Sequence, residues 1–104
     1  MAKNSLFVVS VEEYPELSLE ETCHAYSVSL SFILEMIDHG IIEPGGLSQE
    51  NWRFNTMHLH RIRTAAHLYH DLEINMSGVA LILDMLEDMQ KMQSRLAWFE
   101  KQFS

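Results

Sequence analysis

Residues 28–44 read VSLSFILEMIDHGIIEP, a sequence that specifies one helix together with its start and its stop. Ser29 is a residue type that caps helices, since its hydroxyl accepts a hydrogen bond from a free N–H of the first turn. The stretch therefore predicts a helix from Leu30 to about His39, which Gly40 ends and Pro44 keeps from continuing. The residues expected to form its buried stripe are Leu30, Ile33, Leu34 and Ile37.

A shorter helix is predicted immediately before this one. Ser18 and Glu21 stand three residues apart and form a capping-box pattern. The residues that follow at helical spacing, and that we expect to be buried on one side, are Leu19, Thr22, Cys23 and Tyr26. Only the turn at Ser27 and Val28 separates the two helices, and this spacing is typical of a helix-turn-helix motif.

Two β-type segments flank the pair of helices and predict a small wing. Leu6–Val11 reads LFVVSV, which is short, β-branched and bounded by polar residues, as strands are. Trp52–Phe54 follows a turn-rich loop at residues 44–51, and we expect it to pair with the first segment as a second strand.

Two further helices complete the predicted fold. Asn55 can cap a helix that runs to about Leu72, and the pattern breaks near residues 74–77. A final helix is expected from Gly78 to Phe103. The sequence therefore predicts a mainly α protein: a winged helix-turn-helix domain in residues 1–75 and a long carboxy-terminal helix in residues 76–104, for dimerisation or packing. The residues expected on the buried face of the third helix are Leu59, Ile62, Ala66 and Tyr69.

The final helix predicts a homodimer. At ~1.5 Å per residue it would be about 39 Å long, more than so small a core can cover. Its apolar residues recur at alternating three- and four-residue steps, the repeat of a coiled coil. Gln93 and Glu100 interrupt this seam, so the predicted coiled coil is weak. The residues expected at the dimer seam are Ile82, Leu86, Met89 and Leu96.

Charge is distributed unevenly along the chain. Residues 1–52 hold nine acids and a single base, Lys3, whereas residues 53–104 hold six of each. Nucleic acid is a polyanion, so the acidic half predicts either a basic partner or only solubility. Cys23 is the single cysteine, which favours a reducing compartment, and no run approaches the ~18 apolar residues of a membrane span. We therefore expect a cytoplasmic protein with no membrane contact, for which nucleic acid is an unlikely partner.

Residues 28–44 resemble the second helix and turn of MerR-type regulators, whose pattern is of the form V-S-x-x-x-L-R-Y-Y-E-R-x-G-L-L-x-P. The residues that match without a gap are Val28, Ser29, Gly40, Ile41, Ile42 and Pro44. The mismatches fall on the surface that such regulators turn to DNA: the Arg-aromatic-aromatic run is replaced here by Leu34, Glu35 and Met36. Leucine cannot bind a phosphate, and glutamate is repelled by one.

A longer resemblance covers roughly residues 5–100. Its segments are Leu19–Cys23, Ile37–Pro44, Trp52–Phe54, Leu68–Asn75 and Gly78–Leu83, and together they resemble the chaperone modulatory protein family CbpM. The resemblance implies a MerR-like amino-terminal domain that is not a typical transcription factor. It also implies binding to the J-domain of a DnaJ-like co-chaperone of the CbpA type, with inhibition of its co-chaperone and DNA-binding activities.

The second helix offers a face for such a partner. Ser31, Glu35 and Asp38 share one side of the predicted helix. An acidic row of this kind can meet the basic helix that J-domains present to Hsp70, while apolar neighbours supply affinity. The alternatives are a merely solvated acidic face and, for the apolar neighbours, a place in the core. The residues expected on the adjoining stripe are Phe32, Met36 and His39, and those expected from the wing are Trp52 and Arg53.

No residue pattern predicts catalysis, a metal or a cofactor. His60, His67 and His70 lie on overlapping sides of the third helix, but no Cys-x-x-Cys or His-Glu-x-x-His pattern accompanies them. Asp84 and Asp88 are carboxylates four residues apart on an exposed helix, without the cleft that catalytic pairs need. We therefore expect a non-enzymatic protein.

Two alternatives to a chaperone modulator remain open at the level of sequence. Arg53, Arg61 and Arg63 are clustered bases that could contact a phosphate or two, which keeps a MerR-type DNA-binding regulator as the second hypothesis. A homodimeric structural adaptor, built on the long helix and without any chaperone link, is the third.

Overall fold

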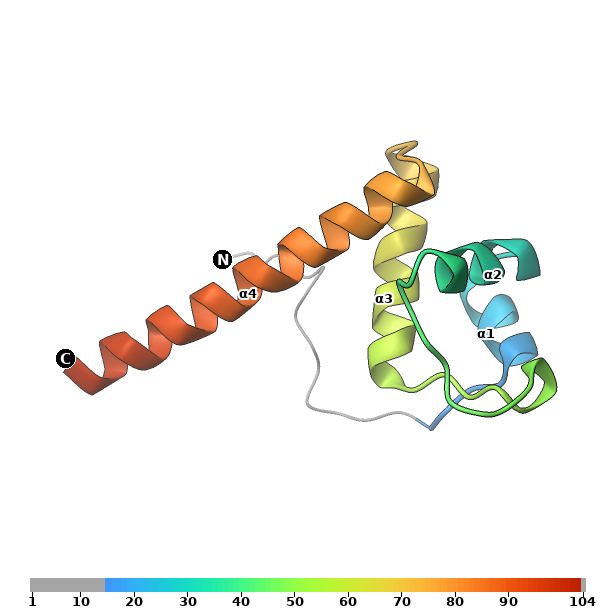
Figure 1. Cartoon of the computed structure of the whole chain (residues 1–104), viewed down its shortest axis with the longest axis horizontal. Helices are drawn as coiled ribbons and strands as arrows, with labels where there is room; N and C mark the ends of the chain where they lie inside the picture. Colours follow the sequence, from blue (N-terminus) through green and yellow to red (C-terminus); the bar gives the residue numbers. More distant parts are fainter. Residues whose placement is uncertain (1–14, 104) are drawn as a thin grey trace.

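The computed structural model describes residues 15–103, and within this range the protein is built from helices (Figure 1). The expected strand at Leu6–Val11 lies outside the described residues. A 3-10 turn, η1, lies in the loop before the third helix, and a π-helical turn, η2, continues that helix at its end. The elements in chain order are α1 (Leu19–Tyr26), α2 (Leu30–Asp38), η1 (Gln49–Asn51), α3 (Thr56–Ala66), η2 (His67–Asp71) and α4 (Met76–Phe103).

The capping box that the sequence predicts at the start of α1 is confirmed. The backbone N–H of Glu21 donates to Ser18 Oγ at 3.1 Å, and the N–H of Ser18 donates to Glu21 Oε1 at 2.8 Å. The helix ends at Ser27 in the left-handed conformation (φ 54°), and the N–H of Val28 donates to Cys23 O at 3.1 Å. This tight end turns the chain directly into α2, so the two helices form the predicted helix-turn-helix.

The stop after α2 also matches its prediction. Gly40 has φ 71°, and the next N–H, from Ile41, donates to Met36 O at 2.9 Å. This bond closes the helix end and directs Ile41 and Ile42 inward, where both side chains are buried. The same turn therefore ends the helix and contributes to the core.

Within the described residues, the Trp52–Phe54 segment pairs with Leu17 and Gly45. Phe54 exchanges two backbone hydrogen bonds with Leu17, at 2.8 and 3.0 Å, and Arg53 exchanges two with Gly45, at 2.9 and 3.2 Å. Each pair is an isolated antiparallel bridge, so no extended strand forms within residues 15–103. These two pairs connect the segment before α1 to the loop that precedes α3.

The third helix runs as α3 and then η2 to Asp71, close to the predicted end at Leu72. Asn55 caps it as expected: the N–H of His58 donates to Asn55 Oδ1 at 2.9 Å, and the N–H of Asn55 donates to His58 Nδ1 at 3.0 Å. Glu73, at φ 56°, then reverses the chain. The last helix begins at Met76, two residues before the predicted Gly78, because the Asn75 side chain accepts from the N–H of Gly78 at 2.8 Å.

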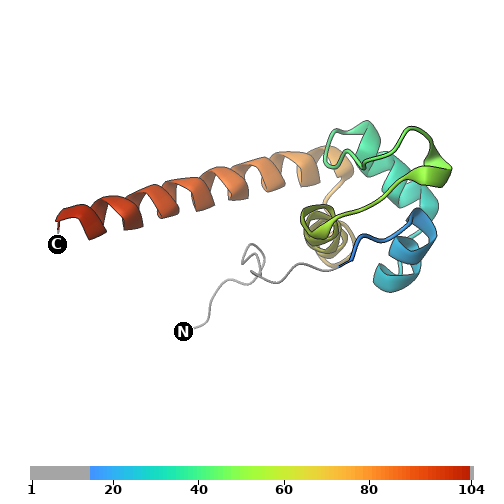
Figure 2. The ribbon, with the colours of Figure 1, turned by 90° about the horizontal axis from the view of Figure 1, so that it is seen from below.

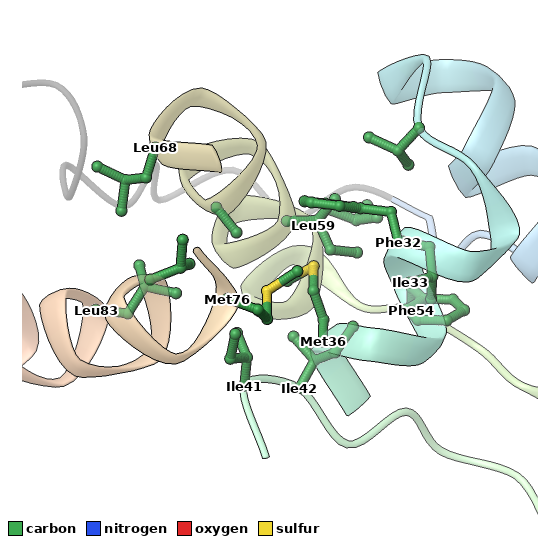
Figure 3. Close-up of a cluster of buried hydrophobic side chains, with 14 residues drawn as sticks. Phe32, Ile33, Met36, Ile41, Ile42, Phe54, Leu59, Leu68, Met76 and Leu83 are labelled. Atoms are coloured by element: carbon green, nitrogen blue, oxygen red, sulfur yellow. The ribbon is translucent and has the colours of Figure 1, made fainter. Parts of the chain in front are cut away.

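The core lies where α2, α3 and the first turns of α4 meet. In Figure 3, Met36 from α2 and Met76 from α4 point toward one another, with Leu59 of α3 beside them. The buried apolar residues are Val28, Phe32, Ile33, Met36, Ile41, Ile42, Phe54, Leu59, Ile62, Ala65, Leu68, Met76, Val79 and Leu83. Ala66 and Tyr69, which were expected in the buried face of the third helix, are half-buried at the margin of this cluster.

Only the first half of α4 belongs to the globular part. Met76, Val79 and Leu83 are buried, whereas every described residue from Lys91 onward is exposed. The helix has 28 residues and projects away from the other elements, as both ribbon views show (Figures 1 and 2). The molecule is accordingly elongated, with extents of 51 × 30 × 25 Å.

The loop before α3 depends on Gly46. This residue has φ 113°, and a Cβ added there would lie 2.4 Å from the backbone oxygen of Asn51. We expect Gly46→Ala to lower the free energy of unfolding by about 1–3 kcal/mol, because the backbone is strained and η1 must move. Gly45→Ala is the matched control, since an added Cβ there meets nothing within 4 Å. Denaturant titration that shows equal stability for the two variants would contradict this reading of the loop.

The cap at His58 makes stability depend on pH. Burial lowers the pKa of His58 below the ordinary 6.5, and its Nδ1 accepts a hydrogen bond only when that atom carries no proton. On acidification, His58 therefore takes up a proton in the unfolded chain before it does so in the folded protein. The stabilisation by His58 is fully present above pH 6.5 and is lost as the pH falls through the lowered pKa. We expect His58→Gln, which keeps a capping side chain, to show a smaller loss of stability on acidification. The measurement is the free energy of unfolding by denaturant titration at several pH values. If it falls equally with pH in the parent protein and in His58→Gln, the cap at His58 is not the source of the pH dependence.

Candidate partner-binding surface

The acidic row of α2 is on the surface. Ser31, Glu35 and Asp38 are all exposed, and so is His39, whose Nδ1 lies 2.9 Å from the backbone oxygen of Glu35. These four of the residues proposed for partner binding therefore lie together on the outer side of one helix. Nothing in the described part of the chain covers them.

Phe32 and Met36 are core residues, so the prediction of an exposed apolar stripe beside the acidic row is wrong. Phe32 is 5% exposed and Met36 0% exposed. The Phe32 ring contacts Tyr69 edge-on, with centroids 5.2 Å apart, and stacks with His70 at 5.3 Å. Apolar residues cover more than half of the circumference of α2, so helical periodicity alone was compatible with two different buried faces. The packing of α3 and η2 against α2 buries the face that contains Phe32 and Met36.

This orientation of α2 leaves Leu30 outside the core. Leu30 was expected in the buried stripe of α2, but it is 43% exposed, and Leu34 and Ile37 are half-buried. The first turn of α2 therefore carries an aliphatic side chain on the surface, next to the acidic row.

Sequence reasoning missed a groove at this position. It lies between the first turns of α1 and α2 and the η1 turn, has a volume of about 900 Å³ and is open to solvent. Its apolar lining consists of Leu19, Cys23 and Leu30, all three assigned to buried stripes from the sequence. Burial raises the pKa of the Cys23 thiol. The residues that line the groove are Ser18, Leu19, Glu20, Cys23, Leu30, Ser48, Gln49 and Glu50.

No signal in the sequence could have revealed this groove. Apolar residues at helical spacing indicate that a stripe is covered, but they do not say how completely. The wall formed by residues 48–50 comes from a loop whose path depends on the bridges at Gly45 and Phe54. Only the tertiary structure brings that loop to the helix ends.

The segment that contains the groove and the acidic row carries many acids. Residues 15–52 contain no lysine or arginine, and they contain seven acids. An anionic ligand would therefore be repelled from both the groove and the acidic row, whereas a cationic ligand would be attracted. The acids are Glu16, Glu20, Glu21, Glu35, Asp38, Glu43 and Glu50.

Trp52 and Arg53, the two partner-binding residues expected from the wing, differ in exposure. Trp52 is half-buried against the core and packs edge-on against Phe54, with ring centroids 6.4 Å apart. Arg53 is exposed, and its guanidinium donates to Trp52 O at 3.3 Å. Trp52 therefore supports the loop, while the Arg53 side chain faces solvent.

The three arginines considered for DNA contact are not equivalent. Arg61 forms ion pairs with two carboxylates of α4, at 3.2 Å to Glu87 and 3.8 Å to Asp84, whereas Arg53 and Arg63 are exposed. Arg61 also lines a second groove of about 780 Å³ between α3 and α4, with His60 and Glu87 among its other walls. The charge of Arg61 is thus engaged within the protein and is not presented as part of a basic patch.

One histidine forms a pair with a carboxylate on η2. His67 Nδ1 lies 2.8 Å from Asp71 Oδ2 across one turn of η2. Within residues 15–103 no group of three or more His, Cys, Asp or Glu side chains is arranged to hold a metal ion. In the same range, no helix combines the length and the hydropathy that crossing a bilayer requires.

The apolar stripe of α4 differs from the predicted seam. Ile82 and Leu86 are half-buried on the side toward the globular part, whereas Met89 and Leu96 are 48% and 58% exposed. Leu81 and Trp98 are exposed as well, but six other exposed apolar residues follow one another at steps of four, three, four, three and four residues, and neither Gln93 nor Glu100 interrupts this series. They are Met85, Met89, Met92, Leu96, Phe99 and Phe103, which we call the outer stripe.

Comparisons with known proteins agree with this architecture. A family model described as MerR HTH family regulatory protein matches residues 17–101. A chaperone modulatory protein CbpM from Coxiella burnetii (strain Dugway 5J108-111) is 36% identical over 101 residues, which cover 97% of this chain and 95% of that protein. Proteins of the same name from Pseudomonas entomophila (strain L48) and Pseudomonas putida (strain W619) are 34% and 33% identical over 79 residues, covering 76% of this chain and 78% of each.

Proposed function

Because this chain belongs to the MerR HTH regulatory proteins and, among them, to the CbpM family of chaperone modulatory proteins, we propose that it binds the J-domain of a DnaJ-like co-chaperone. In this proposal, binding inhibits the co-chaperone and DNA-binding activities of that partner, which is of the CbpA type. The names of the relatives support the coarser statement, a chaperone-modulating role.

The observation that carries the proposal is the charge of the exposed α2 face. Glu35 and Asp38 stand on the helix with which MerR-type regulators read DNA, and no lysine or arginine lies within residues 15–52 to offset them. A basic helix of a J-domain is the complementary partner, and stoichiometric occupation of that helix would keep Hsp70 from it. Charge accelerates the encounter and orients the two surfaces, while apolar contacts determine how slowly the complex dissociates.

The proposed activity is binding alone, without catalysis, a metal or a cofactor. The family assignment favours a non-enzymatic role. We further propose a cytoplasmic location, since the chain has a single cysteine and the proposed partner works with Hsp70.

Glu35→Lys combined with Asp38→Lys tests the proposed face. We expect about tenfold weaker J-domain binding by calorimetry, with a parallel loss of inhibition of J-domain-stimulated Hsp70 ATPase, because two attractive charges become repulsive. Glu73→Lys combined with Glu100→Lys is the matched control, since it changes the net charge equally at exposed positions outside α2. Unchanged binding by the α2 variant would contradict the proposal.

A salt series with duplex DNA separates this function from the second hypothesis. A MerR-type DNA-binding regulator should bind duplex DNA below micromolar concentration and lose affinity steeply as salt increases. A chaperone modulator should bind DNA weakly at every salt concentration. A structural adaptor should self-associate and bind neither DNA nor the J-domain.

We also propose that the chain forms a homodimer through α4, with residues 76–104 as the dimerisation element. The outer stripe of six apolar side chains has the spacing of a coiled coil and lies on the side away from Met76, Val79 and Leu83. Phe99 and Phe103 contact each other at its distal end, with ring centroids 4.6 Å apart. A second copy that offers the same stripe would bury both, as a symmetric interface requires.

Leu96→Glu combined with Phe99→Glu should give a monomer. These substitutions place charge in the centre of the proposed interface, at positions that are exposed in the single chain, so the fold should be retained. Ser94→Glu combined with Ala97→Glu adds the same charge to exposed positions outside the outer stripe. Light scattering after size-exclusion chromatography gives the mass of each protein. A monomeric parent protein, or a stripe variant that remains dimeric, would refute the interface.

A further inference from the structure

We infer that the groove between α1, α2 and η1 receives an aliphatic side chain from a cationic amphipathic helix of the partner. The inference rests on the proposed function for the identity of the partner, and it adds an apolar anchor point that the acidic row lacks. Phe32 and Met36 cannot serve as that anchor because they are in the core.

The apolar part of the groove comes from three side chains that the core leaves uncovered. Leu30 is 43% exposed, although its neighbours Phe32 and Ile33 are buried, and Leu19 and Cys23 are half-buried beside it. The volume of about 900 Å³ lies within the range of sites that take up ligands, ~300–1,000 Å³. Covering Leu30 would remove an exposed aliphatic surface from water, which is a favourable contribution to binding.

The rim of the groove selects a cation. Glu20 and Glu50 are among the lining residues, Glu21 follows in the same turn of α1, and residues 15–52 contain no lysine or arginine. Ser18, Ser48 and Gln49 add uncharged polar groups to the same rim. A lining that combines apolar and acidic side chains fits a partner that carries aliphatic residues on one side and lysine or arginine on the flanks.

The backbone around the groove favours a helical partner over an extended strand. At the starts of α1 and α2, the N–H of Glu21 donates to Ser18 Oγ and the N–H of Phe32 donates to Ser29 Oγ. The η1 turn is closed by its own bonds, such as that from Asn51 N to Ser48 O at 2.9 Å. A strand needs free backbone groups at an edge, whereas a helix is recognised through side chains alone.

The groove lies close to the start of the acidic row. Leu30 belongs to the first turn of α2, where the row begins with Ser31, and Glu35 and Asp38 continue the row at successive turns. A partner helix that inserts a side chain beside Leu30 can therefore also place basic residues against Glu35 and Asp38. The groove would provide the apolar anchor, and the row would determine the direction of the bound helix.

Cys23 provides a direct measurement of groove occupancy because it is the only cysteine and lines the groove. We expect an excess of the J-domain to slow alkylation of Cys23 by N-ethylmaleimide about tenfold, and Leu30→Ala to weaken J-domain binding about tenfold. Leu72→Ala is the matched control, since Leu72 is also exposed but lies beyond α3. Both results are required: a J-domain that binds but leaves the alkylation rate of Cys23 unchanged, or a Leu30→Ala variant that binds it normally, overturns the groove while leaving the proposed function standing.

A model peptide distinguishes failure of the groove from failure of the proposed function. The probe is an amphipathic helix of leucine and lysine, compared with one in which glutamate replaces lysine. Protection of Cys23 by the lysine peptide alone, with no binding of the J-domain, would retain the groove and refute the J-domain as partner. If neither the J-domain nor the lysine peptide protects Cys23, the inference is wrong.

Discussion

The packing of α2 against α3 and the start of α4 determines which side chains of α2 face solvent. Phe32, Ile33 and Met36 fill the space between these helices, and Phe32 is held by the rings of Tyr69 and His70. Removing these side chains from water stabilises the domain, and their burial also determines the rotation of α2 about its axis. With that rotation, Glu35 and Asp38 must point outward and Leu30 must lie at the surface.

The sequence predicted the local structure well because local structure depends on local chemistry. Ser18, Asn55 and Gly40 act at helix ends as expected, since a cap needs only a side chain within three residues or a left-handed turn. The rotation of α2 about its axis could not be predicted in the same way. A buried face that contains Leu30 and Leu34 is as apolar as one that contains Phe32 and Met36. Which pair becomes buried depends on the shape that α3 and η2 present, and that shape is a property of the whole fold.

In the candidate surface, too, features that depend on local chemistry were predictable and features that depend on the whole fold were not. The acidic row was predictable, because charged side chains are rarely buried without a partner. The groove was not predictable, because its wall at residues 48–50 is positioned by backbone bridges to Gly45 and Leu17 that involve no side-chain pattern. The outer stripe of α4 was shifted from the predicted seam because Ile82 and Leu86 turn toward the globular part, which only the packing of α4 on α3 reveals.

Arg61 has an effect on α4 that extends beyond the local charge pairs. Its contacts with Asp84 and Glu87, together with the buried Met76, Val79 and Leu83, attach the first turns of α4 to α3 at more than one point. A continuous helix transmits the direction of its fixed end to its free end, so the exposed half acts as a rigid spacer. If two chains join along that half, the distance between their two grooves is set by helix geometry. A partner with two identical binding helices would then occupy both grooves at once only if the distance between its helices matches the distance between the grooves. The length of α4 would in this way contribute to the choice of partner.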